Sequence, residues 1–217
     1  MRKYQLAIFD LDGTILYTLE DLKNSLNYAL QEHGYPTRTL DEVRRFVGNG
    51  VRKLVERGAP AGTASEALDG LYETFHVYYK EHNLDTSRPY EGIGPLLDKL
   101  RTAGMGTAVV SNKVDYGVQS LCERFFPGKF DMTAGEKPGM RVKPAPDMVN
   151  AVLEALEVSP EDAVYIGDSE VDIQTARNAQ MDVISVTWGF RDEAFLRENG
   201  AKQIVATPEE LYRVLTE

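Results

Sequence analysis

The chain has 217 residues, which suits one large domain or a core domain with a smaller inserted one. Its apolar fraction of 42% is that of an ordinary globular protein, and its apolar runs are too short to cross a bilayer. The net charge of −10 argues against a nucleic-acid backbone as the main partner, so we expect neither nucleic acid nor a membrane as a partner.

The first predicted elements are a strand and then a group of helices. Residues 4–9 are apolar on both faces, as a strand inside a parallel sheet is. From residue 18 to about residue 86 the apolar positions follow helical spacing, and no strand pattern interrupts them. The spacing of a capping box, which begins a helix, occurs at Thr39 with Glu42 and at Thr63 with Glu66.

After residue 88 strands and helices alternate, which predicts a doubly wound parallel α/β sheet. We therefore expect an α/β core domain of residues 1–16 and 88–217, with a small all-helical domain of residues 17–87 inserted after the first strand. Further strands are expected at residues 107–110, 130–134, 163–166, 183–186 and 204–205.

The single cysteine, Cys122, makes an internal disulfide impossible. It falls at helical spacing with apolar neighbours, so we expect a small buried hydrophobic side chain rather than a nucleophile. The first apolar stretch stops at Asp10, which is unlike an export signal. We expect a cytoplasmic protein that is a monomer or a homodimer.

Polar residues follow several of the predicted strands. Ligands of open α/β sheets bind at the carboxyl ends of the strands, so these residues matter for function. Carboxylates are costly to desolvate, and a buried strand that ends in two of them needs a compensating charge. The residues concerned are Asp10 and Asp12 after the first strand, Ser111 after the second, Lys143 in a later loop, and Asp168 with Asp172 after the strand at 163–166.

These residue types suit phosphoryl transfer to a carboxylate. An aspartate can attack phosphorus and form an acyl phosphate, while a hydroxyl and a lysine stabilise the phosphoryl oxygens. Mg²⁺ prefers oxygen ligands, and its charge lets several carboxylates share a site with an anionic phosphate. Asp10 and Asp12 could divide the work, one as nucleophile and the other as acid and base.

The sequence resembles the haloacid dehalogenase superfamily of phosphatases in motifs that occur in the expected order. The helical insertion resembles the cap of its phosphoglycolate phosphatase-like branch. One position departs from that pattern, because Tyr17-Thr18 stands where relatives usually carry an acidic residue followed by Ser or Thr. The matching motifs are Asp10-Leu11-Asp12-Gly13-Thr14, Val110-Ser111-Asn112-Lys113, Lys143-Pro144-Ala145-Pro146 and Gly167-Asp168-Ser169-Glu170-Val171-Asp172.

The resemblance implies a role for each matching residue. Asp10 would be the nucleophile and a Mg²⁺ ligand, and Asp12 the general acid and base, with its backbone carbonyl on the metal. The remaining implied roles are phosphate binding by Ser111 and Lys143, Mg²⁺ binding by the Asp168 carboxylate, and support of that metal site by Asp172.

Further residues are candidates for contact with the substrate. The loop Val47-Gly48-Asn49-Gly50 resembles the specificity loop of such caps, so Gly48, Asn49 and Gly50 are expected to face the substrate. The other candidates are Thr14, Tyr17, Asn112 and Lys113.

The sequence thus predicts a Mg²⁺-dependent phosphatase of a small phosphorylated metabolite, working through an aspartyl phosphate. The resemblance favours 2-phosphoglycolate as the substrate. A phosphomutase related to β-phosphoglucomutase, an inorganic pyrophosphatase and a nucleotidase stay open as other enzymes. A non-catalytic phospho-acceptor protein stays open as another class, because receiver domains also place aspartates, a hydroxyl and a lysine on such a sheet.

Overall fold

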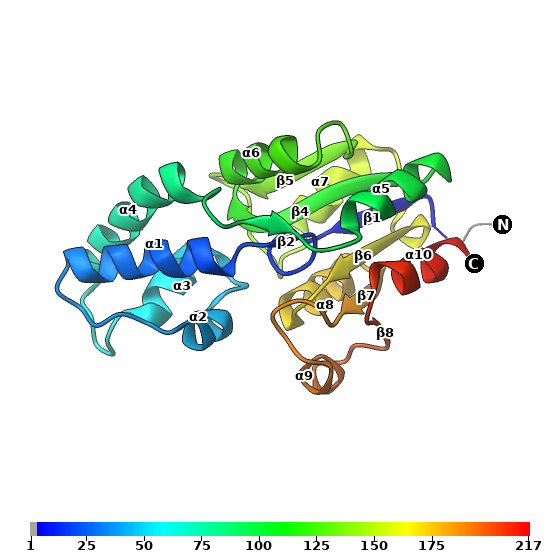
Figure 1. Cartoon of the computed structure of the whole chain (residues 1–217). Coiled ribbons are helices and arrows are strands. Elements are labelled where there is room, and N and C mark those ends of the chain that lie inside the picture. The colour runs from blue at the N-terminus through cyan, green and yellow to red at the C-terminus, as the bar shows by residue number, and fades with distance from the viewer. Residues whose placement is uncertain (1–3) are drawn as a thin grey trace. The chain divides into compact units, whose positions relative to one another are not determined.

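A computed structural model describes residues 4–217, which divide into two compact units (Figure 1). The larger unit takes the chain up to Tyr17 and again from Pro89 to Glu217. The smaller unit is Thr18–Arg88. Within residues 4–217, no helix combines the length and the apolar character that spanning a membrane requires.

The larger unit is built on a six-stranded sheet with the strand order β5-β4-β1-β6-β7-β8. Each neighbouring pair in it is parallel, so the predicted doubly wound α/β fold is confirmed. Its strands are β1 (Leu6–Phe9), β4 (Gly106–Val114), β5 (Met132–Glu136), β6 (Ala163–Gly167), β7 (Asp182–Val186) and β8 (Gln203–Val205). Two short strands, β2 (Leu16–Tyr17) and β3 (Arg88–Pro89), pair in a separate sheet.

Helices cover both faces of the large sheet, because alternate residues of a strand point to opposite sides. Ala7 and Phe9 of β1 belong to the core cluster that includes α5, α6 and α10. Leu6 and Ile8 belong to the cluster that includes α7 and α8. The helices of this unit are α5 (Ile93–Thr102), α6 (Asp115–Phe125), α7 (Asp147–Ala155), α8 (Glu170–Asn178), α9 (Glu193–Glu198) and α10 (Pro208–Thr216), with a 3₁₀ turn at Pro160–Asp162.

Cys122 is buried in the first of these clusters. Burial raises the pKa of its thiol to about 12, and the charge of Asp12 adds to the effect. The thiol therefore stays protonated at neutral pH and packs as a small hydrophobic group, as predicted.

β1 lies between β4 and β6, and its last residue is level with a residue of each. Phe9 pairs with Val109 of β4 and with Ile166 of β6. Asp10, the next residue, donates its backbone N–H to the Ile166 carbonyl at 2.8 Å. The strand order reverses direction at β1, and this is where doubly wound sheets bind ligands.

The strand β4 is longer than predicted. The apolar pattern ends at Val110, but β4 continues through Ser111, Asn112 and Lys113 to Val114. After a shift in register, its pairing with β5 resumes between Val114 and Glu136. The polar residues of the second motif therefore lie at the register shift, between the paired residues Val110 and Val114.

The smaller unit consists of helices whose starts were only partly predicted. Thr39 caps α2 as expected, because its Oγ1 accepts the Glu42 N–H at 3.3 Å and Glu42 accepts the Thr39 N–H at 2.8 Å. The capping box predicted at Thr63 is wrong, because that hydroxyl donates to the Pro60 carbonyl at 2.7 Å and α4 begins at Ser65. The helices are α1 (Leu19–Glu32), α2 (Leu40–Phe46), α3 (Gly50–Gly58) and α4 (Ser65–His82).

A buried carboxylate joins the two ends of the smaller unit. Asp21, in the first turn of α1, is 1% exposed. Its oxygens accept the backbone N–H of Thr86 at 3.0 Å and of Ser87 at 2.9 Å, and both hydroxyls as well. These donors replace the water that burial removes from the Asp21 carboxylate.

Candidate active site

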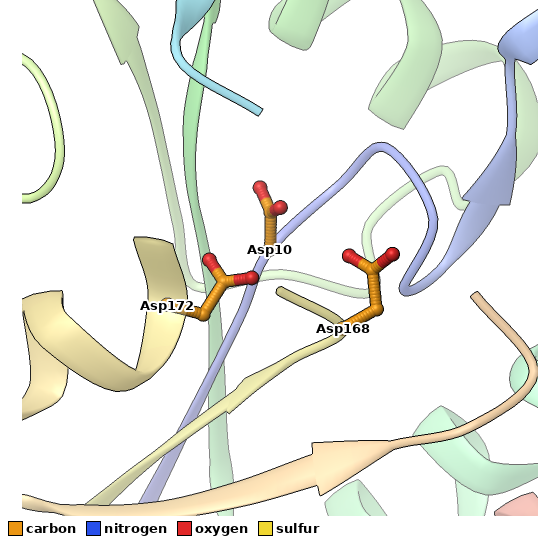
Figure 2. A group of neighbouring side chains, drawn as sticks. All are labelled: Asp10, Asp168 and Asp172. Atoms are coloured by element: carbon orange, nitrogen blue, oxygen red, sulfur yellow. The ribbon is translucent and has the colours of Figure 1, made fainter. Parts of the chain in front are cut away.

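Three aspartates from two strand ends lie together in the larger unit (Figure 2). One carboxylate oxygen from each of Asp10, Asp168 and Asp172 lies within 4.8 Å of the others, and all three residues are buried. Asp10 follows β1, Asp168 follows β6, and Asp172 lies in the first turn of α8. Because β1 and β6 end side by side, residues far apart in the sequence meet after them; Thr14 and Asp168, for example, are 154 positions apart.

Lys143 lies among these carboxylates with its side chain 2% exposed. Its Nζ forms ion pairs with Oδ1 of Asp10 at 2.9 Å and with Oδ1 of Asp172 at 2.8 Å. Burial opposes the charge, but the two carboxylates outweigh it and hold the pKa of Lys143 well above its usual range. Lys143 is therefore a charged ammonium group inside the cluster.

Tyr165 of β6 is a site residue that sequence reasoning missed. Its hydroxyl accepts a hydrogen bond from Lys143 Nζ at 3.0 Å and donates one to the Val110 carbonyl at 2.8 Å. The only available signal was a phenol inside an otherwise apolar strand, since a buried phenol usually needs a partner.

The electrostatics of the cluster remain dominated by burial and negative charge. Burial raises the pKa of Asp10 to about 7, against the lowering effect of Lys143. Burial, followed by the charges of Asp172 and Asp10, also holds the pKa of Asp168 well above its usual range. A divalent cation with oxygen ligands would compensate the charge that one lysine leaves over, so the donor set is compatible with Mg²⁺.

The Asp172 carboxylate uses both oxygens on protein partners. Oδ1 accepts from Lys143 at 2.8 Å, while Oδ2 accepts the Ser169 N–H at 3.1 Å and the Ser169 hydroxyl at 2.7 Å. Ser169 and Asp172 form a capping box at the start of α8, and the same carboxylate orients Lys143.

The Asp168 carboxylate is held by a loop that follows β7. Its Oδ2 accepts the Phe190 N–H at 2.6 Å, and its Oδ1 lies 3.4 Å from the hydroxyl of Thr14. Gly189 permits this approach, because a Cβ there would lie 2.3 Å from the Cβ of Asp168. Thr14 itself is fully buried, and its carbonyl accepts the indole N–H of Trp188 at 2.9 Å.

The second motif lies next to the loop of Lys143. Ser111 is 2% exposed, and its Oγ accepts the Lys113 N–H at 3.3 Å. Asn112 exchanges two hydrogen bonds with the Lys143 backbone, donating to its carbonyl at 2.9 Å and accepting its N–H at 2.7 Å. The Asn112 amide thereby fixes the loop that presents Lys143.

Lys113 reaches Asp12. Its Nζ donates to Asp12 Oδ2 at 2.9 Å, with the Lys113 side chain 1% and the Asp12 side chain 20% exposed. Asp12 therefore has a lysine partner of its own, separate from the one that Asp10 has.

The remaining candidates lie outside this cluster. Tyr17 packs edge to face against Tyr90, with ring centroids 6.1 Å apart, and against Phe190 at 6.5 Å. Gly48, Asn49 and Gly50 belong to the smaller unit, between α2 and α3. There Arg57 donates to the Phe46 carbonyl at 2.6 Å and to Asn49 Oδ1 at 2.7 Å, which gives this loop a defined conformation.

Comparison with known proteins agrees with the geometry. The family model described as haloacid dehalogenase-like hydrolase matches residues 7–186. The chain belongs to this family.

Relatives of this haloacid dehalogenase-like hydrolase specify the class of enzyme. Phosphoglycolate phosphatase of Agrobacterium fabrum is 35% identical over 192 residues, which cover 86% of this chain and 82% of the relative. A crystal structure of a candidate phosphoglycolate phosphatase from Lactobacillus delbrueckii subsp. bulgaricus matches with a TM-score of 0.94 and 40% identity, covering 100% of this chain and 99% of the other. CbbY of Rhodobacter sphaeroides, solved with phosphate, matches at TM-score 0.74 and 25% identity over 96% of each chain.

These matches show that this hydrolase is a phosphatase. The predicted enzyme class is therefore confirmed, and an enzyme is favoured over a non-catalytic phospho-acceptor protein.

Proposed function

We propose that this hydrolase is a Mg²⁺-dependent phosphatase that forms an aspartyl phosphate on Asp10 and acts on 2-phosphoglycolate. The observation that carries the mechanism is how the Asp10 carboxylate is held. Its Oδ1 accepts the Leu11 N–H at 2.7 Å and pairs with Lys143 at 2.9 Å. Its Oδ2 accepts no hydrogen bond from the residues that the structure describes, so this oxygen can attack phosphorus.

The reaction consists of two transfers. In the first, Asp10 Oδ2 bonds to phosphorus and the bond from phosphorus to the leaving oxygen breaks. The leaving oxygen keeps the electron pair and takes a proton from the Asp12 carboxyl. In the second, water attacks phosphorus, Asp12 takes a proton from that water, and the bond between phosphorus and Asp10 breaks. The products are an alcohol and inorganic phosphate.

The other polar residues bind the phosphoryl group and the metal. The Asp10 and Asp168 carboxylates with the Asp12 carbonyl would hold Mg²⁺, which supplies positive charge for the phosphoryl oxygens. The Ser111 hydroxyl and the Lys143 ammonium group bind the same oxygens as charge shifts. Asp172 supports this arrangement by orienting Lys143.

The substrate proposal rests on the relatives and on the helical unit. Matching relatives carry the name phosphoglycolate phosphatase. We propose that residues 17–87 form a cap domain on a core of residues 1–16 and 88–217. Its Gly48-Asn49-Gly50 loop, together with Tyr17, would then select the organic part of the substrate.

The variant Asp10→Asn tests the mechanism. Because an amide is a poor nucleophile, kcat for 2-phosphoglycolate should fall on the order of 10³-fold or more. Asp98→Asn is a matched control, since that aspartate is 61% exposed and should leave kcat unchanged. Full activity of Asp10→Asn would contradict the mechanism.

A parallel screen of pyrophosphate, hexose 1-phosphates and nucleotides tests the substrate. A higher kcat/KM for one of them than for 2-phosphoglycolate would contradict the substrate proposal.

A further inference from the structure

The larger unit contains two buried lysines that serve different carboxylates. Lys143 pairs with Asp10 and Asp172, whereas Lys113 donates to Asp12 at 2.9 Å. The side chains of both lysines are almost inaccessible, at 2% and 1% exposed. A buried ammonium group is costly unless it is paired, so each lysine depends on its carboxylate.

Lys113 is held in place along its whole length. It lies on β4, where its N–H donates to Ser111 Oγ at 3.3 Å. Its stem runs over the first turn of α6, where a Cβ on Gly117 would lie 3.3 Å from the Lys113 Cδ. A lysine confined in this way has already lost most of its rotamer freedom, and it can therefore hold a partner in one orientation.

The two side chains of the Lys113–Asp12 pair differ in their exposure to solvent. Asp12 is 20% exposed, whereas Lys113 is 1% exposed, so the carboxylate is the member of the pair that solvent can reach. The ammonium group donates to Oδ2 of Asp12. The buried ammonium group therefore holds the Asp12 side chain in one orientation.

We propose that Lys113 is the positioning residue for Asp12, holding its carboxyl in the orientation from which it gives a proton to the leaving oxygen. This inference rests on the proposed role of Asp12 as general acid. It adds a role to the expected contact of Lys113 with the substrate, because the amine donates to Asp12.

The role has a kinetic signature that depends on the leaving group. kcat/KM reports the steps up to the first irreversible transfer, in which the leaving oxygen departs. An alkyl phosphate needs a proton from Asp12 at that step, since an alkoxide is a poor leaving group. p-Nitrophenyl phosphate does not, since p-nitrophenolate leaves readily without one. Misplacing Asp12 should therefore slow alkyl esters selectively.

The test uses Lys113→Met, which replaces the ammonium group by an apolar chain of similar length. We expect kcat/KM to fall about tenfold or more for 2-phosphoglycolate and ethyl phosphate, but less than about threefold for p-nitrophenyl phosphate. The ratio of kcat/KM for an alkyl ester to kcat/KM for the aryl ester is measured on one preparation, so it does not depend on the fraction of folded protein. Lys99→Met is the control, because that lysine is 47% exposed and should leave the ratio unchanged.

A double-mutant cycle with Asp12→Asn completes the test. Once Asp12 cannot donate a proton, adding Lys113→Met should change the alkyl rate by less than about twofold. Equal losses for alkyl and aryl esters in Lys113→Met, or additive losses in the cycle, would overturn the inference. Failure of the proposed function has a different readout, which is retained activity of Asp10→Asn with the same esters.

Discussion

In this phosphatase, individual hydrogen bonds and ion pairs orient the buried carboxylates of the candidate site. Lys143 lies 2.9 Å from Asp10 and 2.8 Å from Asp172, and the Phe190 N–H lies 2.6 Å from Asp168. Each carboxylate is therefore oriented by a partner from another part of the chain. Such orientation is what a reacting group or a metal ligand requires, because small displacements cost much of the rate or affinity.

Gly189 is the residue at which this orientation can be tested. A Cβ there would lie 2.3 Å from the Cβ of Asp168 and 2.4 Å from the Gly13 carbonyl oxygen, so the backbone of Gly189→Ala must shift. We expect the Mg²⁺ concentration for half-maximal activity to rise about tenfold or more. Mg²⁺ titration of activity measures this. Gly94→Ala should behave as the unchanged protein, since no atom lies within 4 Å of its added Cβ. An unaltered Mg²⁺ requirement in Gly189→Ala would contradict the role of Asp168.

At the scale of the elements, polar residues extend one strand and connect two distant segments of the helical unit. β4 continues through three polar residues, which lie between two positions, Val110 and Val114, that pair with β5. In the helical unit, α1 is tied to the segment after α4 by Asp21, which accepts hydrogen bonds from Thr86 and Ser87. One carboxylate thus connects the first and last parts of that unit.

We expect Asp21→Asn to lower the free energy of unfolding by about 2–3 kcal/mol, because an amide NH₂ cannot accept the N–H groups that one carboxylate oxygen accepts. Urea unfolding followed by circular dichroism measures the change. Asp69→Asn is the control, since that aspartate is 62% exposed and its ion pair with Arg52 should contribute less than about 1 kcal/mol. Equal stability of the two variants would show that the Asp21 contacts contribute little.

For the whole molecule, the buried acids link stability to pH and to metal. Burial raises the pKa of Asp10 from 3.8 to about 7, so in the absence of metal the folded protein keeps a proton that the unfolded chain releases. The folded state then binds more protons between these values, and its stability falls as pH rises from about 4 to about 7. The limiting slope is about 1.4 kcal/mol per pH unit for one such group.

Thermal unfolding with a chelator, from pH 5 to pH 7.5, measures this dependence. Tm should fall with rising pH more steeply in the unmodified protein than in Asp10→Asn, which has no proton to lose at this position. Mg²⁺ should raise Tm more at pH 7.5 than at pH 5, because it binds the ionised carboxylates. Parallel pH profiles of the two proteins would contradict the assignment of the shift to Asp10.

Local patterns were sufficient for the class of fold and enzyme. Runs that are apolar on both faces and apolar residues at helical spacing are properties of neighbouring residues, and their alternation along the chain predicted the parallel sheet. The four motifs were informative because they occur together and in order. The prediction of a capping box at Thr63 was wrong because it relied on the spacing of two residues alone. The Thr63 hydroxyl instead donates to the nearby Pro60 carbonyl.

By itself, the sequence determined that this protein is an α/β phosphatase with Asp10, Asp12, Ser111, Lys143 and Asp168 as its candidate reacting groups, because these residue types occur in four motifs in the expected order. Only the tertiary structure decided which group partners which. Lys113 meets Asp12 across 101 positions, and Lys143 meets Asp172 across 29. Such pairs depend on strand order, register and side-chain burial, and these are set by the packing of the whole sheet rather than by any one segment.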